Sequence, residues 1–291
     1  MKLRCAISSD LHYGQSEKTH ELHDAFFRNL SEEKIDVLFL AGDLIASKQK
    51  SLDQFFTLLR THLPNIKVLV VEGNHDRWND DIYLSSKHYT ESVPMYSPRE
   101  VYKNRKNIEN RKPMTWGEMN EYHKSLYKKY DLIHLDGSAH DLSNDIVAIG
   151  FDGWYNSTNI QSMGTNDYLF LPENIESAPA MIYLRNKAEK DLEKILELNT
   201  EGKTVIGMTH FPPFSKECPP IEGFHVEESW GANPRFLNFL TEKCDILIVG
   251  HNHHPMDLIY DDCRILNAGA PWDSSKRSYI PQYKIFEIKD E

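Results

Sequence analysis

The stretch VEGNHDRW, from Val71 to Trp78, begins as the end of an apolar run and then turns abruptly polar. The run before it, IKVLVV from Ile66, is apolar and rich in β-branched residues, which predicts a buried strand. A polar group buried without a partner costs on the order of 1–3 kcal/mol, and an unpaired charge costs more. The polar cluster at the end of this strand therefore needs hydrogen-bond partners, a metal ion or solvent.

Length and composition are those of an ordinary globular chain. Its 291 residues are 40% hydrophobic, which is ample for a core. No apolar run approaches the roughly 20 residues that span a bilayer, and the opening MKLRCAISSD turns polar too soon for a signal peptide, so we expect a cytoplasmic protein without membrane contact. The cysteines form no C-x-x-C pair, which argues against a thiolate zinc site. The net charge of −11 argues against a general nucleic-acid binder.

Apolar runs alternate with helical periodicities along the chain, which predicts an α/β protein. The predicted strands are Leu3–Ser9, Val37–Gly42, Ile66–Val71, Ile146–Gly150, Thr204–Met208, Asp245–Val249 and Arg264–Ala268. The predicted helices are His20–Leu30, Leu52–Leu63, Ala178–Leu198 and Pro234–Lys243. Because no internal repeat or Pro/Gly linker divides the chain, we expect a single domain over residues 1–291.

Two long stretches fall outside this alternation. The first runs from about Trp78 to Tyr130 and the second from Trp154 to about Glu176. Insertions of this length are usually functional lids or mobile loops, so we expect a lid or cap at about 78–130. Basic residues within that stretch, Arg105 and Lys106 among them, would draw an anionic substrate toward an acidic protein; a solvated loop is the alternative interpretation.

Polar side chains directly follow most of the predicted strands. In chain order they are Asp10, His12, Asp43, Asn74, His210, His251 and His253. Ligands of open α/β sheets gather beyond the carboxyl ends of the strands, so these side chains should converge. Gly42, Gly73 and Gly250 each precede one of them, where the absence of a side chain lets the backbone turn sharply.

The convergent set has the chemistry of a metal site. Imidazoles and carboxylates without thiolates favour first-row divalent ions such as Mn, Fe, Zn, Co or Ni, whereas all-oxygen sites suit Mg or Ca. The set exceeds what one ion with an open position needs, but two ions about 3.5–4 Å apart that share a carboxylate would use all of it. In the D-x-H and H-x-H pairs, residues two apart in an extended segment point the same way. We therefore predict two divalent ions, with manganese as the first choice.

The motifs DLH, GD, GNHD, TH and GHNH, each after an apolar run, resemble those of the calcineurin-like metallophosphoesterases. The resemblance extends from Asp10 to His253, and several motifs in the same order are far more specific than any one of them. It implies two packed β-sheets flanked by helices, with a binuclear metal site at the carboxyl ends of the strands. It also implies a metal-dependent phosphoric ester hydrolase.

The resemblance further assigns a role to each matching position. One metal takes Asp10, His12 and His253, the other takes Asn74, His210 and His251, and Asp43 bridges them. His75 matches the histidine that contacts the substrate phosphate and assists the leaving group, and Asp76 matches its orienting partner. The implied mechanism is attack on phosphorus by a hydroxide held between the two metals. The NAG at 267–269 resembles a late family element that lines the site.

Departures from family patterns narrow the subfamily. The LIASKQK that follows Asp43 lacks D-R-G, and the third motif ends in Asp76 rather than Glu, so the Ser/Thr protein phosphatases are disfavoured. Ala46 stands where purple acid phosphatases place a metal-binding tyrosine, so that branch of the family is disfavoured too. Asn252 replaces the small Ser or Thr common between the last two histidines, and the extra His254 is expected in a supporting or surface role.

The remaining histidines and the tryptophans are expected mainly to serve packing. The histidines in this group are His20, His23, His62, His88, His123, His134, His140 and His225. Trp78, Trp154, Trp230 and Trp272 are more often packing residues than a substrate platform. Nevertheless, these tryptophans follow strand-end motifs or lie in the intervening loops, and aromatic walls near a phosphate site would suit a nucleobase or aryl group. Trp78 and Trp154 in particular could grip the organic group of a substrate.

The sequence thus predicts hydrolysis of a small organic phosphoester, a diester slightly before a monoester, with a nucleic-acid polymer disfavoured as substrate. A non-catalytic scaffold of the same fold and a DNA nuclease of the superfamily are the alternatives. The complete set of potential ligands together with His75 argues against the scaffold, and the acidic charge argues against the nuclease. The natural substrate and the oligomeric state stay open.

Overall fold

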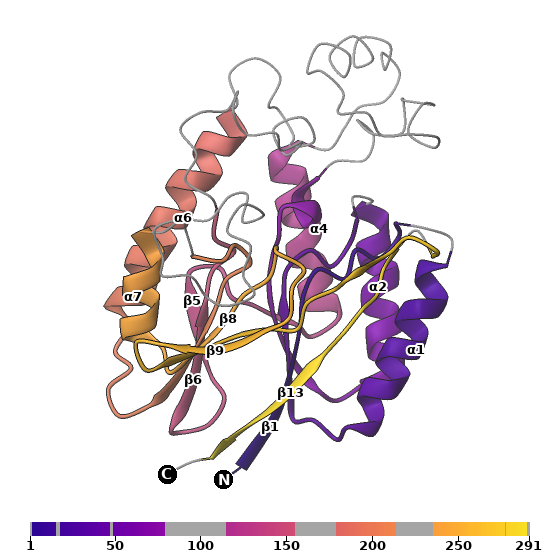
Figure 1. Cartoon of the computed structure of the whole chain (residues 1–291). Coiled ribbons are helices and arrows are strands. Elements are labelled where there is room, and N and C mark those ends of the chain that lie inside the picture. The colour runs from indigo at the N-terminus through magenta and orange to yellow at the C-terminus, as the bar shows by residue number, and fades with distance from the viewer. Residues whose placement is uncertain are drawn as a thin grey trace.

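A computed structural model of the protein describes residues 2–15, 18–46, 49–78, 115–154, 179–213, 235–276 and 278–289. Two β-sheets pack face to face, and helices cover their outer faces (Figure 1). The predicted fold class, an α/β sandwich of two sheets flanked by helices, is confirmed.

The first sheet has the strand order β13-β1-β2-β3-β4. Its members are β13 (Lys284–Lys289), β1 (Lys2–Ser8), β2 (Val37–Ala41), β3 (Lys67–Val71) and β4 (Ile133–His134). Strands β1 to β4 are parallel, so their carboxyl ends share one edge, and β13 closes the other side of β1 antiparallel. The metal-site motifs of the first half of the chain follow β1, β2 and β3.

The second sheet has the order β5-β6-β7-β8-β10-β9. Its members are β5 (Ser138–Asp141), β6 (Ile146–Gly150), β7 (Thr204–Met208), β8 (Ile246–Ile248), β10 (Cys263–Asn267) and β9 (Met256–Tyr260). The inner strands β6, β7, β8 and β10 are parallel, and the edge strands β5 and β9 are antiparallel to their neighbours. A separate two-stranded ribbon pairs β11 (Trp272–Asp273) with β12 (Ser278–Tyr279).

Helices cover the outer face of each sheet. The helices are α1 (Thr19–Glu32), α2 (Gln49–His62), α4 (Trp116–Lys129), α6 (Pro179–Glu197) and α7 (Arg235–Lys243). Figure 1 shows α1, α2 and α4 on the side of the first sheet and α6 and α7 on the side of the second. Each helix buries an apolar stripe against its sheet, which is the usual source of helix stability in a globular protein.

The inner strands are apolar on both faces because each face meets a different core. In β2, Phe39 packs between the two sheets, whereas Leu38 and Leu40 pack under α1 and α2. In β3, Leu69 and Val70 divide in the same way. Parallel strands covered on both faces read as continuous apolar runs, which explains why these strands were predictable from the sequence.

The predicted helices and inner strands are present, with ends shifted by up to three residues. The prediction of an insertion running to Tyr130 was wrong at its end, because α4 occupies Trp116–Lys129 and packs on the first sheet through Leu126 and Tyr127. A capping box starts this helix: the Thr115 hydroxyl accepts the Glu118 N–H at 3.2 Å, and the Glu118 carboxylate accepts the Thr115 N–H at 2.8 Å.

The lid proposed at about 78–130 lies mostly outside the described residues, because 79–114 are not described, and the same is true of 155–178. The single domain and the lid therefore stay predictions. Among the described residues, no helix is long and apolar enough to cross a membrane. The cytoplasmic location stays a prediction as well.

Candidate metal centre

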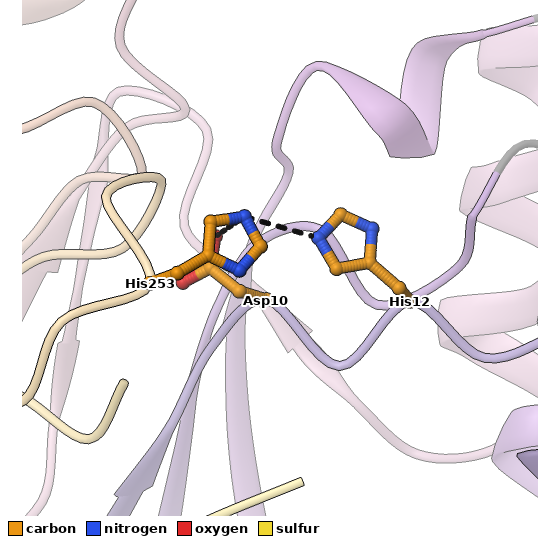
Figure 2. A group of neighbouring side chains, drawn as sticks. All are labelled: Asp10, His12 and His253. Atoms are coloured by element: carbon orange, nitrogen blue, oxygen red, sulfur yellow. Dashed lines mark hydrogen bonds and ion pairs between the residues drawn. The ribbon is translucent and has the colours of Figure 1, made fainter. Parts of the chain in front are cut away.

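The strand-end side chains predicted from the sequence lie together at one edge of the sandwich. Potential ligand atoms lie within 4.8 Å of one another in the groups Asp10–His12–His253, His12–Asp43–His75 and Asp43–His210–His251. Figure 2 shows the His12 and His253 imidazoles pointing toward each other beside Asp10. The structure thus gathers in one place the residues for which the sequence predicts metal ligation.

Asp43 lies at the centre of the cluster and faces both halves of it. Its Oδ2 lies 3.8 Å from His12 Nε2 and 4.0 Å from His75 Nε2, while its Oδ1 lies 3.5 Å from His210 Nε2. The side chain is buried, and Oδ1 also accepts the backbone N–H of His75 at 2.9 Å. One carboxylate that turns its two oxygens toward different imidazoles is suited to bridge two ions.

The spacing of the donor atoms fits shared cations. The Nε2 atoms of His12 and His253 are 3.4 Å apart. Two imidazole nitrogens bound tetrahedrally to one ion at about 2.1 Å would be separated by about 3.4 Å. In the other half, His210 Nε2 and Asn74 Oδ1 are 3.2 Å apart, a similar spacing for two ligands of one ion.

Burial lowers the pKa of two central imidazoles of the cluster, His12 and His210. Burial, followed by the neighbouring His75 and His253 rings, holds the pKa of His12 well below its usual range. Burial and the nearby His251 ring do the same to the pKa of His210. Among the described residues, the buried Nδ1 of His12 has no hydrogen-bond partner. Neutral imidazoles crowded around carboxylates are metal donors rather than a positively charged surface, so these residues fit divalent ions.

The local backbone of the ligand motifs differs from expectation. Asp10 and His12 have φ of 55° and 46°, and His251 and His253 have φ of 69° and 57°. The prediction of extended D-x-H and H-x-H segments was therefore wrong, because left-handed residues turn these loops at alternate positions. Asp43 shares this conformation with φ of 53°. Such residues cost of order 1–3 kcal/mol each and persist where surrounding contacts enforce them.

The three glycines before the ligands serve different needs. Gly42 has φ of 81°, and a Cβ built on it would lie 2.5 Å from His210 Nδ1. Gly73 and Gly250 lack a positive φ, but a Cβ on Gly73 would lie 2.1 Å from Asp43 Oδ1, and one on Gly250 would lie 2.5 Å from the Ala41 carbonyl oxygen. The sharp turn expected from the sequence therefore applies to Gly42, whereas the other two permit close approach of the ligand loops.

The Asp76 carboxylate holds the backbone after β2 and β3 and does not contact the His75 ring through a hydrogen bond among the described residues. Its Oδ1 accepts the backbone N–H groups of Leu44 at 2.8 Å and Ile45 at 3.2 Å, and its Oδ2 accepts that of Gly73 at 2.9 Å. The Nδ1 of His75 instead donates to the Ala46 carbonyl oxygen at 2.6 Å. The orienting effect expected of Asp76 would thus act through the 43–46 loop.

A buried network behind the centre joins the two sheets and was missed by sequence reasoning. The Arg77 guanidinium, at the end of the GNHDR turn, bonds Asp152 after β6 and lies 3.0 Å from Glu72. The Nδ1 of His123, on α4, lies 3.0 Å from Glu72 Oε1, and the Nε2 of His134, on β4, lies 3.0 Å from Asp152 Oδ1. Burial alone would raise the pKa of the Glu72 carboxyl, but the Arg77 charge and the His123 ring together outweigh burial and hold that pKa below its usual range. No sequence motif links these residues to one another, so only the tertiary structure reveals the network.

The NAG element at 267–269 is hydrogen-bonded to residues that neighbour predicted ligands. Asn267 is fully buried, and its Oδ1 accepts the Ser9 hydroxyl at 3.0 Å and the Gly269 N–H at 2.8 Å. Its Nδ2 donates to Asn252 Oδ1 at 2.6 Å, while the Ser9 hydroxyl also lies 2.5 Å from Asp10 Oδ2. This chain of hydrogen bonds links the first ligand loop to the H-x-H loop.

The aromatic residues divide between core and site. Trp154 is 2% exposed and packs against Phe211 at 5.0 Å between ring centroids, so it belongs to the core, and the idea that it grips substrate was wrong. Trp78 covers the His75 ring at 3.7 Å. Tyr279, which sequence reasoning missed, covers the His253 ring at 4.2 Å and the His12 ring at 4.5 Å.

Several of the other histidines serve the fold, as predicted. Both nitrogens of His23 meet backbone carbonyls, those of Thr19 at 2.8 Å and Leu11 at 2.9 Å. His254 is exposed. His88, His225, Trp230, Arg105 and Lys106 lie outside the described residues.

Comparison with known proteins identifies the family of the chain. The family model for calcineurin-like phosphoesterases matches residues 3–255. A phosphopantetheinyl hydrolase from Mycobacterium tuberculosis superposes with a TM-score of 0.60 at 14% identity, over 91% of this chain and 88% of its own. The protein TT1561 from Thermus thermophilus superposes with a TM-score of 0.50 at 14% identity, over 92% and 90%. A dimetal phosphatase from Danio rerio superposes with a TM-score of 0.50 at 10% identity, over 91% of this chain and 86% of its own. No curated protein sequence matches the chain significantly.

Because the family model matches most of the chain, the protein belongs to the calcineurin-like phosphoesterases, as its motifs predicted. It is a metal-dependent phosphoric ester hydrolase. The family is binuclear, and the Asp and His groups of this chain can hold metal. At these identities the superpositions show a shared fold and no more.

Proposed function

We propose that the protein hydrolyses a small organic phosphoester at two divalent ions. The observation that carries this proposal is the orientation of Asp43, whose two oxygens face His12 on one side and His210 on the other. One ion would take Asp10, His12 and His253, the other would take Asn74, His210 and His251, and Asp43 would serve both. Manganese is the expected metal, with Fe, Zn, Co or Ni as alternatives.

The bound ions would supply Lewis acidity that activates water and offsets the charge developing on the phosphoryl oxygens. His75 would assist the leaving group. Its Nδ1 is engaged with Ala46, so Nε2, which lies 4.0 Å from Asp43 Oδ2, is the nitrogen that faces the reacting atoms. Burial lowers the pKa of His75 to about 3, and an incoming phosphate anion would favour the protonated ring that can donate to the leaving oxygen.

A small substrate is favoured over a polymer. The chain carries a net charge of −11, which disfavours a nucleic-acid backbone. The proposed lid begins directly after Trp78, which covers the His75 ring, so its base adjoins the metal centre. The names of two structures with the same fold, a phosphopantetheinyl hydrolase and a dimetal phosphatase, agree with phosphate ester chemistry. Within this class we place a diester slightly before a monoester.

The test is a substrate panel. Purified protein with added Mn²⁺ is assayed against nucleotide, cyclic nucleotide, lipid and aryl phosphates, with Asp43→Asn as the inactive comparison. Hydrolysis of small esters that requires Mn²⁺ and Asp43 supports the proposal. Hydrolysis confined to DNA or RNA, or no hydrolysis with any divalent ion, overturns it.

A further inference from the structure

The ribbon of β11 and β12 places Tyr279 beside two predicted metal ligands and Trp272 beside Tyr279. Tyr279 lies with its ring centroid 4.2 Å from that of His253, at an interplanar angle of 28°. Trp272 meets the same tyrosine edge-on at 5.1 Å. Trp272 is 50% exposed, although a large aromatic side chain usually buries most of its surface.

Hydrogen bonds tie this ribbon to the ligand loop. The Ala270 N–H donates to the His253 carbonyl oxygen at 3.1 Å, and the Ala270 carbonyl oxygen accepts from His253 Nδ1 at 3.2 Å. On the far side of the ribbon, the Ile280 N–H donates to the Pro271 carbonyl oxygen at 3.0 Å. The position of Trp272 is therefore set relative to His253, one of the predicted ligands.

Hydrogen bonds also hold the residues that directly follow β11. The Asp273 carboxylate accepts the Ser275 N–H at 2.9 Å and the Ser275 hydroxyl at 2.6 Å. At the other strand, the Tyr279 N–H donates to the Gln15 side-chain oxygen at 3.4 Å, and Ser278 is buried. An exposed ring on a held backbone is preorganised, so a ligand that stacks on it loses less affinity to ordering.

We propose that Trp272, supported by Tyr279, forms a wall that recognises a planar aromatic group on the substrate, such as a nucleobase or an aryl group. The inference deepens the proposed function and rests on it. An indole face offers stacking to any flat π-system and offers much less to a flexible alkyl chain, so the wall would select between organic groups attached to the same phosphate. Trp272 is thus assigned as a specificity-determining residue, with Tyr279 as its positioning residue.

The experiment compares esters that differ in the organic group. Wild type, Trp272→Ala, Trp272→Phe and Trp272→Leu are assayed with Mn²⁺ on bis(4-nitrophenyl) phosphate against glycerophosphocholine, and on adenosine 5′-monophosphate against glycerol 3-phosphate. Phe239→Ala is the matched control, because Phe239 is 48% exposed and lies on α7. Metal content is measured for every variant.

Wild type should favour the aromatic member of at least one pair in kcat/KM. In Trp272→Ala the ratio of kcat/KM for the aromatic ester to kcat/KM for its partner should fall about tenfold. The fall should come mainly from a higher KM for the aromatic ester, because a single stacking contact is lost. Trp272→Phe should keep most of the ratio and Trp272→Leu should lose it, since leucine is apolar but cannot stack. Phe239→Ala should leave the ratio unchanged.

The inference is overturned if wild type shows no preference for the aromatic ester of either pair, or if Trp272→Ala lowers kcat/KM equally for both members of each pair. A Trp272→Leu variant that keeps the ratio also overturns it, because general apolar contact would then suffice. Failure of the proposed function looks different, since wild type would then cleave no small ester in any arm.

Discussion

His75 donates from Nδ1 to the Ala46 carbonyl oxygen at 2.6 Å, which leaves its Nε2 facing Asp43. A carbonyl oxygen can only accept, so the contact sets which nitrogen carries the proton in the neutral ring. His75 also forms a potential ligand group with His12 and Asp43. Geometry alone therefore allows this ring to be either a ligand or a group that acts on the substrate, and the distinction is experimental.

His75→Ala should keep its metals and lose on the order of 10²–10⁴-fold in kcat, the usual effect of removing a positioned acid or base. Elemental analysis and steady-state kinetics on the best substrate of the panel would measure both quantities. His254→Ala, at an exposed position nearby, is the control and should behave as wild type. Loss of metal from His75→Ala would instead identify His75 as a ligand.

Asp43→Asn should weaken both metal sites together, because the two oxygens of this carboxylate face different imidazoles. Wild-type protein reconstituted with Mn²⁺ should approach two ions per chain, measured by elemental analysis after desalting, whereas the variant should retain less than one. Asp145→Asn, at an exposed aspartate, should not change the stoichiometry. Wild-type stoichiometry near zero after reconstitution would contradict the binuclear assignment.

Arg77→Met should lower the free energy of unfolding by about 3–5 kcal/mol, because it leaves buried carboxylates without their cation. The side chains of Arg77 and Glu72 are 4% and 3% exposed, so solvent cannot replace the lost partner. Urea denaturation of metal-free protein measures the change. Adding Asp152→Asn should recover part of the loss, since the variants share one network. Lys124→Met, in an exposed pair, should cost at most about 1 kcal/mol. Additive losses at Arg77 and Asp152 would show that the network is not coupled.

Asp76→Asn should destabilise the protein by about 1–3 kcal/mol, because an amide cannot accept the three N–H groups that the carboxylate accepts. We also expect lower kcat, since the 43–46 loop carries the carbonyl that anchors His75. Urea denaturation and kinetics test both effects. Wild-type stability in this variant would mean that the loop does not depend on the carboxylate.

Cys5, Cys244 and Cys263 should resist alkylation in the native protein. Burial, followed by the nearby Asp36, raises the pKa of Cys5 to about 12, and burial raises that of Cys263 to about 12. Because the thiolate is the reactive form, a raised pKa leaves little of it at pH 8. Mass spectrometry after iodoacetamide treatment should find these peptides unmodified in the native protein and labelled in urea. Rapid native labelling would contradict the buried placement.

The inner strands were predictable because their signal is local. Ile146–Gly150 and Thr204–Met208 end where the sequence predicts, since apolar, β-branched runs bounded by polar residues carry their own boundaries. The ligand motifs were visible for the same reason: each follows a strand within a few residues. The direction of parallel strands then brings their carboxyl ends to one edge.

The edge strands were not predictable in this way. In β9, Ile259 is 65% exposed, and β13 owes its place to pairing with β1 at the opposite end of the chain. Helix α4 carried a readable capping box at Thr115 and Glu118, but the polar segment before it masked the signal. Strand formation at an edge depends on a partner that is distant in sequence, so propensity alone cannot decide it.

The sequence by itself determined the fold class, the inner strands and the residues available as metal ligands, because each depends on neighbours along the chain. Only the tertiary structure decided the left-handed turns at Asp10 and His12, the link from Arg77 to Asp152 between the sheets, and the position of Tyr279 over His253. These features rest on contacts between segments far apart in the chain. Packing, rather than local preference, supplies the energy that holds a strained backbone or a buried charge in place.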